Sequence, residues 1–560
     1  MKRLLRPSTL VFVLFAMAAC AAALVLWPRA AANHAWPLSL PDGDQEVVWL
    51  YPATNAAPWE RFVFALLWAQ KERAGDTRMA TFGVDDRNAF PDQTTTVPEV
   101  AVTFPGSTRR LWFRWYKITS DLKSQDWLAA LLARRTPPLA IIGGGTSDVA
   151  IELARGLQSE TDRLQLGSAA PLLLLTTATV DAVDNAEGAQ ETSLNGLYAK
   201  HIFRFCFTNK QMAEAVTSFI WSYGDLRPDA EPYYVTFWKD DPYSTDLNRR
   251  FCDALRFAPY LTAARDWAWQ AATAALGGMP LDLSNVLYSQ SRMETPFYPA
   301  SILYSVGAFA RPNRWEFAEA EQLMDRLERY PQQRRPLLVV PAAAQPARRF
   351  LRGLVHTSPI EARRFLVATG DAVTFNTVYR DRNMAWPIQD LPFTLVFFCH
   401  RNPTDARAQQ AQLPTEHSPG ATESIEGREA PGTEDLLLFA DIVDVLIGAC
   451  RQENGLAHAV PANAAQLRER FHQARWSKAG ERVTYEAGEP FFDEEGNRRS
   501  GTGEHVVLLR PAMRGQRVLA EAYLEVCPRR EDARGRRTWA RPAKPLVVHY
   551  EGYSDPGGAD

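Results

Sequence analysis

Strand-like and helix-like hydrophobic patterns alternate along the chain from Glu46 onward. Short apolar runs are typical of buried strands, and apolar positions three and four residues apart are typical of helices covering a sheet. The predicted strands are Glu46–Tyr51, Leu111–Ile118, Leu139–Ile142, Leu172–Leu175, Tyr233–Trp238, Ile302–Val306, Leu337–Val340, Phe365–Ala368, Phe393–Phe398 and Val506–Leu509. The predicted helices are Trp59–Arg73, Asp126–Arg134, Val149–Leu157, Met212–Tyr223, Asp246–Leu255, Trp315–Arg329, Arg348–Leu354, Asp435–Cys450 and Ala464–Ala474. This alternation predicts an α/β fold of two successive doubly wound units.

Two stretches interrupt the alternation. Residues 258–300 are irregular and rich in Pro, Met and aromatic residues, and residues 402–434 carry Pro and Gly among polar residues, as expected of a mobile insert. The helix Asp435–Cys450 that follows has one apolar stripe, formed by Leu436, Phe439, Ala440, Val443, Leu446 and Ile447. The stripe predicts that this helix returns to pack on the first unit.

The N-terminus has the pattern of an export segment. Lys2, Arg3 and Arg6 precede the apolar run Leu10–Trp27, which as a helix would be about 27 Å long and would nearly span a bilayer core. Small residues follow at 30–32, as at a signal cleavage site. We therefore expect residues 1–32 to be a signal peptide or a membrane anchor, with an apolar helix over 8–27. Either alternative places the rest of the chain in the periplasm or another extracytoplasmic space.

Composition and motifs exclude several classes of protein. The chain has 560 residues, enough for several domains, and 62 Lys and Arg against 65 Asp and Glu, so no basic surplus favours a nucleic-acid partner. The six cysteines are scattered without metal-binding spacing, which leaves one disulfide possible but predicts no metal. No H-E-x-x-H or G-x-S-x-G motif is present, and S-x-x-K at Ser120–Lys123 lacks its companion motifs. We expect no enzyme activity and no cofactor.

The segment Leu139–Ser147 reads as a buried strand, a turn of three glycines and the start of a helix. Backbone N–H groups at such a helix start, with the hydroxyls of Thr146 and Ser147, suit an anion such as a carboxylate. The turn lacks the third glycine of the G-x-G-x-x-G fingerprint and the lysine of a phosphate-binding loop. Because any doubly wound fold needs a turn of this kind, the segment alone leaves a purely structural role open.

Further motifs follow this turn in a recognisable order: Pro171–Thr179, Ile202–Phe205, Gln211–Ala215, Tyr234–Tyr243 and Phe492–Arg498. In this order and spacing they resemble the type I periplasmic solute-binding proteins of the leucine/isoleucine/valine-binding (receptor ligand-binding region) family. The resemblance covers about residues 46–527.

The resemblance implies two lobes, joined by three crossing segments, that close on a ligand in the cleft between them. The expected divisions are 46–205 for the first part of lobe one, 206–374 for the first part of lobe two, 375–455 for the return to lobe one, 456–527 for the return to lobe two, and 528–560 for a tail. The function implied is binding of a small solute, such as an amino acid or amide, and its delivery to an ABC-type permease in the membrane. The alternative is a membrane-anchored sensor or scaffold with the same fold and no transport role.

The resemblance also implies the binding residues. Thr146 and Ser147 match the hydroxyl residues that hold a carboxylate, and Ala178 with Thr179, or with Thr177, matches the small residue and the threonine at the end of the next strand. Tyr243 matches the aromatic residue that stacks on the ligand, and Asp371 the acid that meets an amine. The chain departs from the family at Pro341–Gln345, where an aromatic residue is usual, and at Ser244, where glycine is usual. These departures bear on the identity of the ligand more than on the fold.

Overall fold

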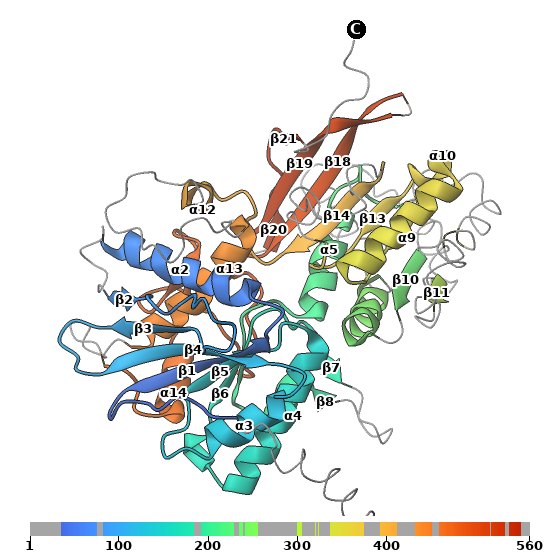
Figure 1. Ribbon diagram of the computed structural model, residues 1–560. Helices are drawn as coiled ribbons and strands as arrows, with labels where there is room; N and C mark the ends of the chain where they lie inside the picture. The colour runs from blue at the N-terminus through green and yellow to red at the C-terminus, as the bar shows by residue number, and fades with distance from the viewer. Residues whose placement is uncertain are drawn as a thin grey trace, which may run out of the picture.

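The computed structural model describes residues 35–74, 82–183, 192–228, 234–238, 241–255, 300–304, 320, 323, 336–373, 392–411, 432–450, 459–515, 517–531 and 537–549. These residues form two separate large sheets, and helices cover both faces of each (Figure 1). We call each sheet with its packed helices the first and the second unit. The expected helix at residues 8–27 and the expected mobile insert lie outside the described residues, except for 402–411 and 432–434.

The first sheet has seven strands in the order β2-β3-β4-β1-β5-β6-β9. Their bounds are β1 Gln45–Pro52, β2 Gly83–Asp85, β3 Glu99–Thr103, β4 Arg110–Ile118, β5 Ala140–Gly143, β6 Leu172–Leu175 and β9 Ile202–Arg204. Strands β4, β1, β5, β6 and β9 run parallel, as the alternation predicted, while β2 and β3 add an antiparallel edge that the pattern did not reveal.

Side chains alternate between the two faces of β1, because successive residues of a strand point to opposite sides. Val48 and Leu50 face the helices α3 (Ser124–Leu132) and α4 (Ser147–Leu164). Trp49 faces α2 (Ala57–Ala74) and α13 (Thr433–Gly448), and its ring stacks on Phe439 with centroids 6.0 Å apart. The prediction that the amphipathic helix beginning near Asp435 returns to the first unit is therefore confirmed.

The second sheet joins parallel and antiparallel strands in the order β11-β10-β12-β13-β14-β18-β19-β20, and β21 also pairs with β19. The parallel strands are β10 Tyr234–Trp238, β11 Ala300–Tyr304, β12 Leu337–Val339, β13 Leu366–Ala368 and β14 Thr394–Cys399. The antiparallel strands are β18 His505–Arg514, β19 Arg517–Glu531, β20 Arg537–Trp539 and β21 Leu546–His549. One face packs on α9 (Ala344–Thr357), and the other on α5 (Asn209–Ser222) and the helical residues 242–255.

Smaller elements connect or flank the sheets. They are β7 Ala182–Val183, β8 Thr192–Ser193, η1 Gly167–Ala169, η2 Leu194–Tyr198, α10 Pro359–Ala362, α12 Ala406–Ala411, α14 Ala464–Phe471, β15 Arg475–Ser477, β16 Arg482–Thr484 and β17 Glu489–Pro490. Side chains from α14, β15 and β16, with Phe491 and Phe492 just after β17, join the apolar core of the first unit.

The strand and core assignments move three expected boundaries. Strand β14 belongs to the second sheet, so the return to the first unit follows Cys399 and does not begin at 375. Within 456–527, Phe471 and Trp476 pack in the first unit, and only β18 and β19 join the second sheet. The expected tail beyond 528 supplies β20 and β21. Hydrophobic pattern identifies a strand but not its neighbour, which is why these divisions differ.

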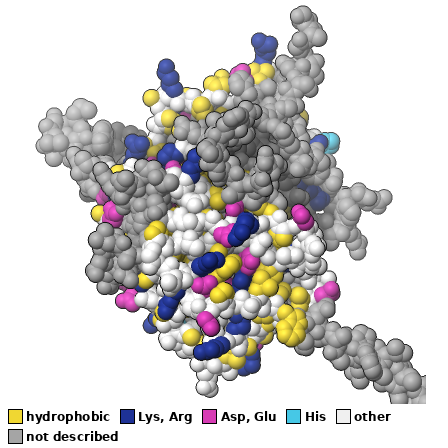
Figure 2. Space-filling view, turned by 60° about the vertical axis from the view of Figure 1, so that its left-hand side comes forward, with side chains coloured by type: hydrophobic (Ala, Val, Ile, Leu, Met, Phe, Trp, Pro, Cys, Tyr) yellow, Lys and Arg dark blue, Asp and Glu magenta, His cyan; other side chains and the backbone are white. Residues whose placement is uncertain are grey.

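The described surface carries mixed charge. On the face shown in Figure 2, Lys and Arg side chains lie among Asp and Glu side chains. This mixture accords with the near balance of charge in the sequence. Among the described residues, no helix is both long and apolar enough to cross a membrane.

Candidate functional site

The first sheet changes winding direction between β1 and β5, because β4 follows β1 on one side and β5 lies on the other. Ligands of doubly wound sheets bind outside the carboxyl ends of the strands at such a point. Here Tyr51 ends β1, and the glycine turn 143–145 joins β5 to α4. The second sheet repeats the arrangement between β10 and β12, where Tyr243 follows the first strand and Pro341 the second.

Helix α4 begins directly after the glycine turn, at the carboxyl end of β5. Thr146 is its N-cap residue, is exposed, and makes no capping hydrogen bond through its side chain. Ser147 is only 4% exposed, and no described residue bonds its hydroxyl. The first N–H groups of a helix lack partners within it and carry partial positive charge. The helix start therefore offers a hydroxyl and backbone donors to an anion.

Two glycines fit the turn tightly. Gly144 has a φ of +66°, and an added Cβ would lie 2.7 Å from Leu175 Cδ2 and 2.8 Å from Ala150 Cβ. A Cβ on Gly145 would lie 2.8 Å from the Tyr51 ring, whose hydroxyl bonds the Thr176 hydroxyl at 2.6 Å. Thr177 donates to the Gly145 carbonyl at 2.8 Å. Packing thus holds the end of β6 against the turn.

We expect Gly144→Ala to lower the free energy of unfolding by about 2–4 kcal/mol, because it combines an unfavourable φ with overpacking. Gly106→Ala is the matched control, since Gly106 has a φ of +76° with nothing within 4 Å of its added Cβ. Urea unfolding of both variants separates the two costs. Equal losses would show that the contacts with Leu175 and Ala150 do not constrain the turn.

Ala178 and Thr179 lie beyond β6, and both are buried. The Thr179 hydroxyl is buried without a hydrogen-bond partner, while its carbonyl accepts hydrogen bonds from Arg204 Nη1 at 3.2 Å and from the Asn209 N–H at 2.8 Å. Arg204 is itself 1% exposed, bonds Asn195 Oδ1 at 3.3 Å, has an unbonded Nε, and forms no ion pair with a described carboxylate. A buried cation without a counter-ion favours a nearby anion.

Three polar side chains meet at the strand ends of the second sheet. The Tyr243 hydroxyl donates to Asp371 Oδ1 at 2.8 Å, and His400 Nε2 lies 2.9 Å from Asp371 Oδ2. The Phe207 N–H donates to His400 Nδ1 at 3.1 Å, so the ring proton is on Nε2 and points at the carboxylate. Burial and the negative charge of Asp371 raise the pKa of Tyr243 well above its usual value.

Glu434, in the first turn of α13, lies beside this trio. Its Oε1 accepts the backbone N–H of His400 at 2.8 Å. Burial raises the pKa of Glu434 to about 8, and the negative charges of Asp435 and Asp371 add to the rise. Glu434 is therefore mostly protonated at neutral pH.

The two units touch beside these residues. The backbone N–H of Asp181 in the first unit donates to Asp246 Oδ2 in the second unit at 2.8 Å, and Arg250 lies 3.6 Å from the Asp181 carboxylate. Burial raises the pKa of Asp241, and the negative charge of Asp148 at the start of α4 adds to the rise. The strand ends of the two sheets thus face one another.

Three segments cross between the units, at 205–208, 399–401 and 498–504, and Arg498 of the third contacts the first directly and the second through Asp441. Its guanidinium lies over the Phe207 ring at 4.4 Å, donates to the Phe205 carbonyl at 3.0 Å, and pairs with Asp441 at 3.2 Å. Arg401 pairs with the same carboxylate at 3.0 Å. Burial lowers the pKa of Arg498 to about 10.

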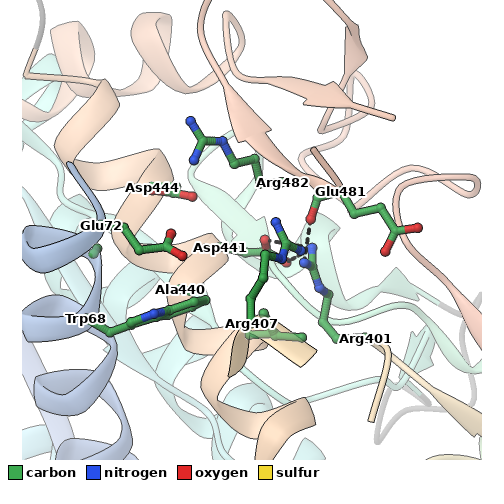
Figure 3. A pocket seen from close by; sticks show the side chains of 11 residues that line it. Trp68, Glu72, Arg401, Arg407, Ala440, Asp441, Asp444, Glu481 and Arg482 are labelled. Carbon is green, nitrogen blue, oxygen red and sulfur yellow. Dashed lines mark hydrogen bonds and ion pairs between the residues drawn. The ribbon is translucent and has the colours of Figure 1, made fainter. Parts of the chain in front are cut away.

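A small cavity of about 30 Å³ opens behind Arg401 (Figure 3). It lies between α2, which contributes Trp68 and Glu72, and α13, which contributes Asp444; Arg407 also lines it. A cavity of this size holds one or two water molecules. It is too small to be the site of an organic solute.

The structure groups the sequence-predicted residues in two sets. Thr146, Ser147, Thr177, Ala178 and Thr179 line the strand ends of the first sheet. Tyr243 and Asp371 are bonded to each other at those of the second. Among the described residues no hydrogen bond joins the two sets, and no group of His, Cys, Asp and Glu could hold a metal ion.

Several residues of this region were missed from sequence: Tyr51, Thr176, Arg204, His400 and Glu434. His400 carried a usable signal, since it directly follows the apolar run Phe393–Phe398 and so ends a predicted strand. Arg204 and Glu434 carried none, because only burial distinguishes them from surface charges. The described cysteines, Cys206, Cys252, Cys399, Cys450 and Cys527, are free thiols.

Comparisons with known proteins give structural likenesses only. No family model matches the chain, and no curated protein matches it in sequence. An ABC transporter substrate-binding protein from Desulfitobacterium hafniense aligns at a TM-score of 0.46 and 14% identity, covering 89% of this chain and all of that one. A solute-binding protein from R. palustris in complex with 4-hydroxybenzoate aligns at a TM-score of 0.47 and 9% identity, and the alignment covers 85% of this chain and 95% of that one.

A leucine-, isoleucine-, valine-, threonine- and alanine-binding protein from Brucella ovis aligns at a TM-score of 0.44 and 10% identity, covering 92% of this chain and 97% of that one. With TM-scores below 0.5, these likenesses carry no argument about ligand or activity. The three solved structures named here are substrate-, solute- or amino-acid-binding proteins, and two of them are described as parts of ABC transporters.

Proposed function

We propose that the chain binds a small solute between its two units, in an extracytoplasmic space, and delivers it to an ABC-type permease. The observation that carries the proposal is the facing of the two sets of strand ends around three crossing segments. Crossing segments of this kind allow two rigid units to close on a ligand. The site would comprise Thr146, Ser147, Thr177, Ala178, Thr179, Tyr243 and Asp371.

The unsatisfied groups support a ligand at this place. The Thr179 hydroxyl is buried without a hydrogen-bond partner, and the Ser147 hydroxyl has no described partner. A buried hydroxyl without a partner, such as that of Thr179, costs about 1–3 kcal/mol, which a bound solute or water would recover. The start of α4 would receive the anionic group of the solute, and Tyr243 would contact it from the second unit.

The proposal is tested by a thermal-shift screen of the full chain in detergent against amino acids, amides, short peptides and organic acids. A ligand present at 100 times its Kd stabilises the folded state by about 2.7 kcal/mol, so one class should raise the Tm by several degrees. A labelled form of that ligand should then accumulate less in cells of the source organism from which the chain has been deleted.

We expect Ser147→Ala and Tyr243→Ala to weaken binding of the identified solute roughly ten- to a hundredfold, because each removes a direct contact. Ser168→Ala is the control, since Ser168 is exposed in η1, before β6. Isothermal titration calorimetry gives the three dissociation constants. Wild-type affinity in both site variants would place the solute elsewhere.

One observation favours the alternative of a sensor or scaffold without transport. Several polar groups at the facing strand ends already bond one another, as in the pairs Tyr51–Thr176 and Tyr243–Asp371. A chain that binds no solute in the screen, and whose deletion leaves uptake unchanged, would support this alternative.

A further inference from the structure

We infer that the protonation of Glu434 is coupled to the arrangement of the two units: the arrangement in this structure holds a proton on this carboxyl, and separation of the units releases it. The inference rests on the proposed closure of the two units but on no particular solute. Glu434 lies in the first turn of α13, a helix of the first unit, and contacts the crossing segment 399–401.

A chain of contacts runs from the first unit to the second through Glu434. Glu434 Oε1 accepts the backbone N–H of His400 in the crossing segment at 2.8 Å. The ring of His400 donates from Nε2 to Asp371 Oδ2 at 2.9 Å, and the Tyr243 hydroxyl donates to Asp371 Oδ1 at 2.8 Å. Asp371 and Tyr243 belong to the second unit, so a single residue of the crossing segment lies between the two carboxyl groups.

The surroundings of Glu434 contain acids but no paired cation. Glu434 is 5% exposed, and no described Lys or Arg forms an ion pair with it. On its own helix stands Asp435, which pairs with Arg61 of α2 at 3.2 Å. The thiol of Cys399 in the crossing segment bonds Glu434, and Asp371 faces it from the second unit. Burial raises the pKa of Glu434 to about 8, and the charges of Asp435 and Asp371 add to the rise.

One of these charges depends on the arrangement of the units. Asp435 and Arg61 both lie in the first unit, so separation of the units leaves their effect on Glu434 unchanged. Asp371 follows β13 of the second sheet, whereas Glu434 is fixed in α13. Separation therefore moves a like charge away from Glu434 and lowers its pKa. A proton that binds one arrangement more tightly favours that arrangement.

The direction of the pH effect follows from this difference. Well below the pKa of Glu434 in the separated arrangement, both arrangements hold the proton and pH changes nothing through this residue. As the pH rises toward 8, the separated arrangement releases its proton first and gains population. At higher pH both arrangements are ionised and the ratio levels off. A site between the units would therefore retain its solute better at neutral than at alkaline pH.

Double electron–electron resonance on the full chain in detergent tests the coupling without any solute. Spin-labelled non-canonical amino acids replace Arg155 in α4 and Ile360 in α10, two exposed positions, one in each unit. The ratio of molecules at the label distance of this structure to molecules at other distances should fall roughly three- to tenfold from pH 7 to 9, as expected for repulsion between two partly buried carboxylates. A single distance at every pH, or a constant ratio, would overturn the inference, while the thermal-shift screen judges solute binding separately.

Two variants separate the coupling from a general effect on stability. Glu434→Gln keeps an oxygen for the His400 N–H but cannot ionise, so its ratio should not vary with pH. Asp371→Asn leaves Glu434 ionisable but removes the charge in the second unit, so the ratio should vary less than in wild type although stability to urea still falls as pH rises. Glu214→Gln, at an exposed position of α5, should behave as wild type. A pH response that persists in Glu434→Gln, or is undiminished in Asp371→Asn, would contradict the coupling.

Discussion

Replacing Asp441 with asparagine will lower the free energy of unfolding by about 3–5 kcal/mol, the usual cost of removing one partner from a buried ion pair. The Asp441 carboxylate is 2% exposed and pairs with Arg401 and Arg498. Its loss leaves two buried guanidinium groups without a counter-ion. Urea denaturation followed by tryptophan fluorescence measures the change.

Asp435→Asn is the matched control, because Asp435 lies on the same helix and pairs with Arg61 at 3.2 Å in a partly exposed position. Exposed pairs contribute about 0–1 kcal/mol, so this variant should stay near wild type. If Asp441→Asn does not fold, the double variant with Arg401→Gln should recover part of the loss, since it buries one cation fewer. Equal effects of Asp441→Asn and Asp435→Asn would contradict the importance of the buried pairs.

Raising the pH from 5 to 8 will lower the free energy of unfolding of the wild-type protein by about 4 kcal/mol more than that of the Glu434→Gln variant, because Glu434 ionises in the unfolded chain. Burial raises the pKa of this carboxyl from 4.5 to about 8 in the folded state. Between these values the folded chain holds a proton that the unfolded chain releases, so stability falls as pH rises. Below about pH 4.5 the two states bind the proton equally, and above about pH 8 the effect levels off.

Glutamine keeps the oxygen that accepts the His400 N–H but cannot ionise, so the slope due to this residue should vanish in Glu434→Gln. Glu214→Gln, at an exposed position of α5, should retain the wild-type profile. Free energies of unfolding measured in urea at several pH values give the pH dependence of stability for the wild type and both variants. A profile of Glu434→Gln that runs parallel to wild type would show that this carboxyl is ionised in the folded protein.

The candidate site was predictable where it depends on local pattern. The glycine turn before Ser147 ends an apolar run and begins a helix, so sequence alone places it at the carboxyl edge of a sheet. Asp371 follows a predicted strand in the same way, and the resemblance to solute-binding proteins singled it out. Its partners could not be predicted, because His400 and Tyr243 come from different strand ends and approach Asp371 only when β10, β13 and β14 assemble.

The sequence by itself determined the alternation of strands and helices, the parallel core of both sheets and the apolar stripe that brings α13 to the first unit. These features follow from local periodicity, since burial of one face requires apolar residues at regular spacing. Only the tertiary structure decided that β14 joins the second sheet, that Arg498 contacts the crossing segment at 205–208, and that Asp371 accepts hydrogen bonds from Tyr243 and His400. Strand pairing and the partners of buried charges depend on contacts between residues far apart in the chain, and local periodicity does not specify such contacts.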